Sequence, residues 1–343
     1  MTNIPDLLGR PAIIILLSLI LLAAAGYFTY DIYFNKRAID VWDIVPGNAL
    51  IVYEPSECQS CMEEIKQSAV WKIIENASFY NEKNDSLTAS LAKVVSSNPQ
   101  LLISVHATNK DDFDYVFYLP DFKDQPDLVN KAFGSNNFRQ RKREFNSVSI
   151  HEASFSRQVF SWTVIDHIWV GSFTSFLIED VVRASSGKNG FKDKISSVHR
   201  LSQENTNAGN IYLQLSNFSD WLSLFYSHDN SLPEVLGRST SLTVKPEPGH
   251  IVLNGVSTDT ADQSKYLLSV FHRQSPVSFN LKNLIANSTI ALKSFGVSDG
   301  ASFRTDLRSF VTRNAPGVMD SLDLLGKTAH VDFSELYNSI QDE

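Results

Sequence analysis

The sequence is poor in cysteine, with only Cys58 and Cys61 among 343 residues. So few cysteines exclude a disulfide-stapled scaffold, and without neighbouring histidines they cannot supply the four ligands of a structural zinc site. Positive charge is not in excess either, because the net charge is −8. This balance argues against nucleic acid as a main partner.

Glycine-rich phosphate and dinucleotide motifs are also missing. No G-x-G-x-x-G occurs, and Gly187-Lys188-Asn189 fails as a phosphate loop because position 182 is Val and Asn189 replaces the required Ser or Thr. No H-E-x-x-H pair occurs, since His151-Glu152 lacks a second histidine. We therefore expect no cofactor and no metal, and we predict that the protein is not an enzyme.

One long apolar run stands out, from Ala12 to Tyr30, with no charge and no proline. A helix of this length, at about 1.5 Å per residue, spans roughly 28 Å, close to the hydrocarbon thickness of a bilayer. We predict a transmembrane helix over residues 12–34, after a short tail over residues 1–11. The lipid bilayer is then the first partner of the chain.

Two alternatives compete with this anchor: a cleaved signal peptide and a buried core helix. Ala23–Ala25 offers a small-residue cleavage site, but Asp6 is unusual in a signal peptide and the run is long. A core helix would show some polar stripe. Arg10 nearly balances Lys36 and Arg37, so orientation rests on the short N-terminal tail. We expect a single-pass cell-membrane protein with an extracytoplasmic, periplasmic domain.

From about residue 40 the pattern is that of an α+β fold. The hydrophobic spacing predicts strands at 49–54, 101–106, 115–119, 147–153, 158–166 and 168–171, and helices at 56–77, 87–94, 128–133 and 173–184. We assign residues 40–187 to a first unit. A turn cluster at 185–190 and a polar stretch at 205–209 end it.

A second unit over residues 205–343 repeats the first in outline. Strands are predicted at 210–215, 239–245, 250–257 and 288–295, and helices at 218–226, 261–271, 301–312 and 333–340. The predicted fold class is therefore α+β, with an N-terminal transmembrane helix followed by repeated strand–helix–β-hairpin–helix units that form antiparallel sheets packed by helices. On this reading the chain stops inside a unit, as a C-terminally truncated protein would.

Several short segments carry a family resemblance. They are Pro46–Glu54 just after the anchor, Ser104–Thr108 before Phe113–Phe117, Leu253–Gly255, and Gln274–Pro276. Together they resemble the membrane-anchored bacterial proteins that carry the domain of unknown function numbered 3352, over about residues 40 to 310. The resemblance implies the anchored architecture. It brings no activity and no catalytic residues.

The sharpest local signal is Cys58-Gln59-Ser60-Cys61, which follows a predicted strand and opens a predicted helix. A helix N-terminus stabilises a thiolate, so the pair suits a thiol–disulfide redox site with Cys58 attacking and Cys61 resolving. The surroundings argue against it, because no βαβ pattern precedes the pair and nearby glutamates raise a thiol pKa. A local disulfide or two idle thiols is the simpler reading.

The other polar groups have simpler readings. Histidines are scattered, with His106 ending a predicted strand, His151 within one and His167 in a turn. The basic run Arg139–Arg143 suits anionic lipid or a protein, although a solvated strand or turn is more usual. Asp111, Asp112 and Asp114 read as a hairpin turn, with too few ligands for calcium.

These observations lead to two functional hypotheses. The first is a membrane-anchored, extracytoplasmic, non-enzymatic module that binds an envelope protein or an apolar ligand, or that acts as an envelope scaffold. The alternative is an envelope thiol–disulfide redox protein that uses Cys58 and Cys61.

Overall fold

The computed structural model describes residues 39–56, 59–68, 71–72, 86–95, 100–110, 112–121, 127–134, 138–155, 158–187, 190–199, 207–223, 235–247, 250–258, 265–286, 288–289 and 292–330. The chain divides into two compact units, Met1–Asp40 and Val41–Glu343, and the fold below is that of the second. The predicted tail over 1–11, the predicted transmembrane segment 12–34 and the predicted helix 333–340 lie outside the described residues. Within the described residues, no helix is long and apolar enough to cross a bilayer.

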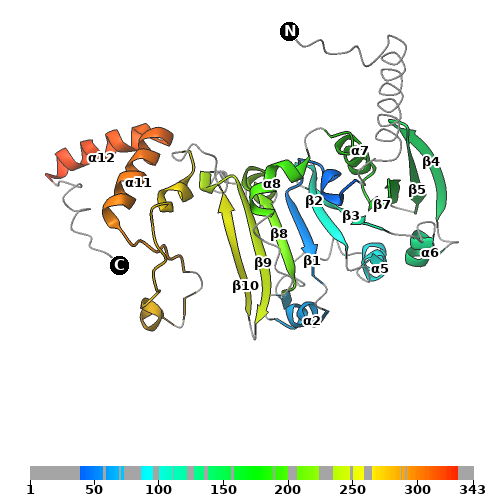
Figure 1. The fold of residues 1–343 in the computed structure, drawn as a ribbon, viewed down its shortest axis with the longest axis horizontal. Helices are drawn as coiled ribbons and strands as arrows, with labels where there is room; N and C mark the ends of the chain where they lie inside the picture. The colour runs from blue at the N-terminus through cyan, green and yellow to red at the C-terminus, as the bar shows by residue number, and fades with distance from the viewer. Residues whose placement is uncertain are drawn as a thin grey trace, which may run out of the picture. The chain divides into compact units, whose positions relative to one another are not determined.

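The core of the fold is one antiparallel sheet of ten strands. In chain order the strands are β1 (Ile51–Pro55), β2 (Leu102–Asn109), β3 (Asp112–Leu119), β4 (Arg139–Phe145), β5 (Val148–Ser154), β6 (Val159–Ile165), β7 (Ile168–Ser172), β8 (Gly209–Gln214), β9 (Ser239–Glu247) and β10 (His250–Thr258). Across the sheet they follow the order β10-β9-β8-β1-β2-β3-β7-β6-β5-β4. The edge strands β10 and β4 therefore lie at opposite ends of the sheet (Figure 1).

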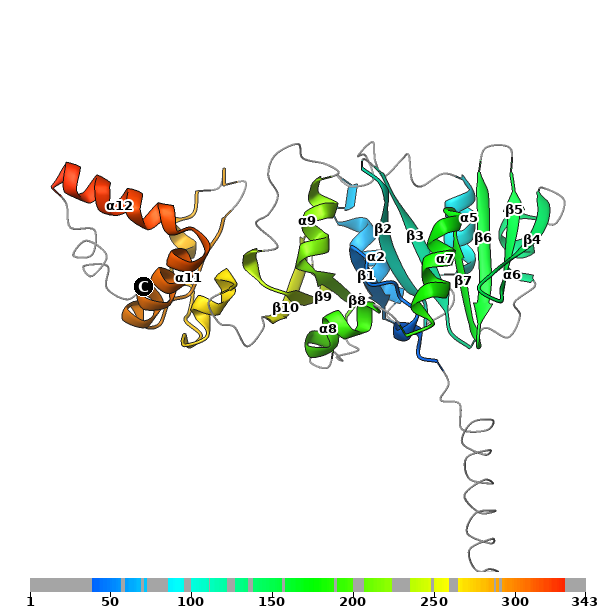
Figure 2. The same ribbon diagram turned by 90° about the horizontal axis from the view of Figure 1, so that it is seen from above.

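Helices cover both faces of this sheet (Figure 2). They are α2 (Gln59–Gln67), α5 (Ser86–Val95), α6 (Asp127–Phe133), α7 (Ser175–Ala184), α8 (Phe191–His199) and α9 (Leu215–Ser223), with a short 3-10 turn η1 (Val41–Asp43). α5 and α6 pack their apolar side chains on the main core cluster, and α2 packs on a smaller one. α7 buries Leu177, Ile178 and Val181 on the opposite face.

Alternating side chains build the main core. Phe160 and Trp162 on β6 and Trp169 on β7 point to the face that α5 and α6 cover, and all three rings belong to one buried cluster. Gly171 makes room for them, because a Cβ atom there would lie 2.4 Å from the Trp169 ring and 2.5 Å from the Phe160 ring. The hydrophobic spacing that predicted the strands at 158–166 and 168–171 thus reflects real packing.

The predicted fold class is wrong in its organisation, although its α+β content is confirmed. We predicted repeated units with sheets of their own after a transmembrane helix, and the structure describes neither. β8, the first strand of the predicted second unit, pairs along its length with β1, from Ile51 opposite Leu213 to Pro55 opposite Gly209. Because β1 is flanked by β2 and β8, both edges of this short strand are satisfied, and the two predicted units share one continuous sheet.

The last described elements contain only helical turns and helices. They are η2 (Leu267–Phe271), η3 (Leu281–Leu284), α11 (Gly300–Asn314) and α12 (Pro316–Ala329). Phe271 contacts Phe295 and Phe303, at ring-centroid distances of 5.7 and 5.3 Å, and Arg273 pairs with Asp306 at 2.6 Å. The predicted strand at 288–295 is wrong, because its described residues are not in a strand.

Candidate functional site

The cysteine pair is only partly within the described chain. Cys61 lies in α2, half-buried against Ile65, Trp71 and Ala208, and it forms a disulfide. Cys58, the other predicted redox residue, lies outside the described residues. A disulfide at this position suits the structural reading of the pair, and the redox hypothesis stays a prediction.

A hydrogen-bonded chain runs from buried residues of β2 and β3 to the exposed Asn48 and to Asp180 of α7. His106 Nε2 lies 2.7 Å from Ser104 Oγ, which lies 3.0 Å from the hydroxyl of Tyr118. On its other side, His106 Nδ1 lies 3.3 Å from Oδ1 of Asn48, whose Nδ2 lies 3.5 Å from Oδ2 of Asp180. Since Asn48 Oδ1 can only accept, His106 carries its proton on Nδ1 and accepts from Ser104.

Burial sets the ionisation of this chain. Ser104, His106 and Tyr118 are fully buried. Burial lowers the pKa of His106 to about 3, so the imidazole is neutral at ordinary pH. Burial also raises the pKa of Tyr118 well above its usual value. Ser104, His106 and Tyr118 thus each have a neutral hydrogen-bond partner, which is how a low-dielectric interior tolerates such polar groups.

This order of groups resembles a nucleophile, its base and the group that orients the base. Ser104, His106 and Asn48 stand in those positions, at hydrogen-bond distances. A nucleophile must nevertheless reach its substrate, and the side chains of Ser104 and His106 have no exposed surface. The arrangement therefore fastens β2 and β3 to the chain around Asn48, and it does not form an open catalytic site.

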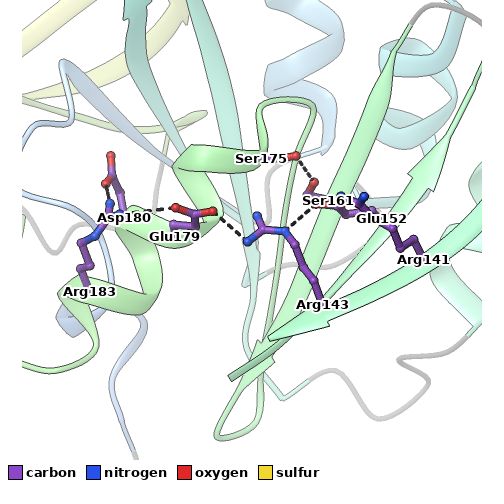
Figure 3. Close-up of polar contacts among 8 residues, drawn as sticks. All are labelled: Arg141, Arg143, Glu152, Ser161, Ser175, Glu179, Asp180 and Arg183. Carbon is purple, nitrogen blue, oxygen red and sulfur yellow. Dashed lines mark hydrogen bonds and ion pairs between the residues drawn. The ribbon is translucent and has the colours of Figure 1, made fainter. Parts of the chain in front are cut away.

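A second polar cluster ties the edge strand β4 to β5 and α7. Glu152, which is buried, accepts from Arg141 and Arg143 at 2.7 Å each. Arg143 reaches on to Glu179 at 2.8 Å, and Glu179 also pairs with Arg183 at 3.4 Å. Figure 3 shows Glu179 between the two arginines. In the same view Ser161 on β6 meets Ser175 of α7, with 2.6 Å between their hydroxyls.

Charge compensation explains why these groups are stable where they lie. Burial alone raises the pKa of Glu152, but the hydrogen bonds from Arg143 and Arg141 outweigh it and lower the pKa below its ordinary value. Burial lowers the pKa of Arg143, and its bonds to Glu152 and Glu179 outweigh this and raise it. Arg141 and Arg143 of the basic run thus belong to a charge-compensated network.

The remaining predicted positions are scattered. Arg139 and Lys142 are exposed on β4. His151 stacks on Trp162 with 5.4 Å between ring centroids, and His167 lies by Asp166 in the turn between β6 and β7. Asp114 accepts from Thr174 Oγ1 at 2.6 Å, which is a structural role, while Asp111 lies outside the described residues. No metal-holding group of His, Cys, Asp or Glu occurs in the part of the chain that the structure describes.

The sequence also contains a G-x-S-x-G run at Gly296–Gly300, which was not among the predicted sites. A serine elbow needs a strand before it and a helix after it. Here residues 292–297 are not a strand, and Asp299 caps α11 by accepting from Ala301 and Ser302. Ser298 Oγ bonds Gln274 and the backbone of Ser275. The run is therefore a helix-capping turn.

The two edges of the sheet differ in chemistry. β4 is basic and is held to its neighbours by the network around Glu152. β10 has no charged residue from Ile251 to Thr258, and most of its side chains are exposed. Leu253 and Val256 are 50% and 41% exposed. A long, uncharged, exposed edge strand is a template for pairing with another chain. β10 is therefore the candidate binding site.

Comparisons with known proteins assign this chain to no family. No protein-family model matches the chain, and no curated protein and no solved structure is significantly similar to it. The resemblance to proteins with the domain of unknown function 3352 stays a prediction.

Proposed function

We propose that this protein is a non-enzymatic binding module, tethered to the membrane through residues 12–34, that takes a protein partner along the edge strand β10. The observation that carries the proposal is an uncharged edge strand that, among the described residues, pairs with another strand on one side only, in a sheet whose opposite edge is charged. The partner supplies an extended segment that continues the sheet by main-chain hydrogen bonds.

The membrane part of the proposal rests on the sequence. Residues 12–30 have the length and composition of a membrane span, and we place the folded domain on the extracytoplasmic side. In such a location the module meets envelope proteins.

Binding suits this fold better than catalysis. Ser104 and His106, whose side chains lie at hydrogen-bond distance as in a catalytic serine–histidine pair, are fully buried. Leu253 and Val256 on β10, in contrast, are exposed to solvent.

Site-specific photo-crosslinking tests this proposal. A benzoylphenylalanine at Leu253, in the full chain in its native membrane, is expected to give an adduct of one discrete mass. Phe176 on α7 is the matched control, because it is also an exposed apolar residue, 43% exposed, but lies away from the edge. Equal labelling from both positions, or none from Leu253, contradicts the proposal.

A further inference from the structure

We propose that the segment that pairs with β10 is β10 of a second copy of this chain. The two strands run antiparallel, with a local two-fold axis at Asn254, and the two sheets become one. This inference rests on the proposed function, and it names the partner.

The edge is regular enough to act as such a template. β10 pairs with β9 without interruption, from His250 opposite Glu247 to Thr258 opposite Ser239. An edge strand paired in this way turns the N–H and C=O groups of every second residue outward. An axis at Asn254, the midpoint of the strand, brings all nine residues of each copy into register.

The edge strands β10 and β4 differ in charge, and only β10 can pair with its own copy without repulsion. Self-pairing of β4 about Lys142 would set Arg141 opposite Arg143, and like charges directly opposite each other destabilise a strand pair. Between Ile251 and Thr258 the edge β10 carries no charge that could repel its copy. The net charge of −8 on each chain opposes association, but at physiological salt the screening length is only about 8 Å.

The side chains of β10 are complementary about the proposed axis. Val252 of one copy faces Val256 of the other, a β-branched pair of the kind that favours strand pairing. Leu253 faces Gly255, which offers no side chain to clash with it. This isologous arrangement uses the same patch on both copies, as two-fold dimers do.

The mass of the full chain in non-ionic detergent, measured by light scattering over micromolar concentrations, tests the inference. The wild type is expected to be a dimer. Val256→Lys is expected to raise the dissociation constant at least tenfold. Val159→Lys, at an exposed valine of β6, is the matched control and is expected to leave the constant unchanged.

A cysteine at the axis gives a second readout that does not depend on weakening the fold. Antiparallel partners lie about 4.5 to 5.5 Å apart at Cα, within disulfide range. Asn254→Cys is therefore expected to give a disulfide-linked dimer on mild copper-phenanthroline oxidation. Lys142→Cys, in the middle of β4, is expected not to do so.

The outcomes separate this inference from the proposed function. A monomeric wild type, or a dimer that Val256→Lys leaves intact, overturns self-pairing. If Leu253 then still crosslinks to a different protein, binding along β10 stands and only the identity of the partner falls. If Leu253 crosslinks to nothing, both fall.

Discussion

Gly209→Ala is expected to lower the free energy of unfolding by about 3 kcal/mol. Gly209 begins β8, where that strand pairs with β1, and its φ of +136° is a conformation that L side chains rarely adopt. A Cβ atom there would lie 2.4 Å from the Glu54 carbonyl oxygen and 2.9 Å from Pro55 Cα. Both obstacles are backbone atoms of β1, so relief requires the strand pair to separate.

Urea unfolding of the full chain in mild detergent, followed by tryptophan fluorescence, measures this effect. Gly187→Ala is the matched control, because Gly187 also has a positive φ, +78°, but has nothing within 4 Å of the new Cβ. Its cost is expected to be about 1 kcal/mol. If the two variants lose the same stability, the close contact between β8 and β1 is not the reason for glycine at position 209.

The second large effect is a loss of folding stability at acid pH. Burial holds the pKa of His106 at about 3 in the folded chain, against about 6.5 when unfolded. Between these values the unfolded chain binds the extra proton. The contribution of His106 is therefore complete above about pH 6.5 and is lost as the pH falls toward 3. From pH 7 to pH 4.5 we expect a loss of about 2 to 3 kcal/mol from this group.

A comparison of pH slopes isolates the contribution of His106. His106→Gln keeps a polar side chain between Ser104 and Asn48 but does not titrate, so its stability is expected to fall less from pH 7 to pH 4.5 than that of the wild type. The buried neutral histidine is refuted if the variant and the wild type show the same slope.

Local elements were predictable where apolar residues alternate or follow one another in a short run. β2 buries alternate residues at its start, whereas β7 is buried at every position from Ile168 to Ser172. β4 was missed as a definite strand because its alternation is between charged residues. The signal that reveals it is the two-residue turn Asn146-Ser147, since both residues have positive φ, as a tight hairpin requires.

Long-range arrangement was not predictable from the same pattern. Nothing in the sequence near Ile51 indicates that its strand pairs with β8, more than 150 residues later, so the order of elements suggested separate units. The buried chain around His106 was hidden for the same reason, because Asn48, Ser104 and Asp180 meet only in the folded sheet. The edge strand β10 became a candidate only once the order of the strands was known.

Hydrogen exchange of the β10 amides in the membrane-embedded full chain tests most directly whether this edge is a binding surface. Occupied by a partner, the outward amides between Ile251 and Thr258 are expected to exchange slowly, and Val256→Lys is expected to make them fast while the β5 amides stay unchanged. Fast exchange along β10 in the wild type would contradict the account, because it would leave the edge facing water and the module without its partner.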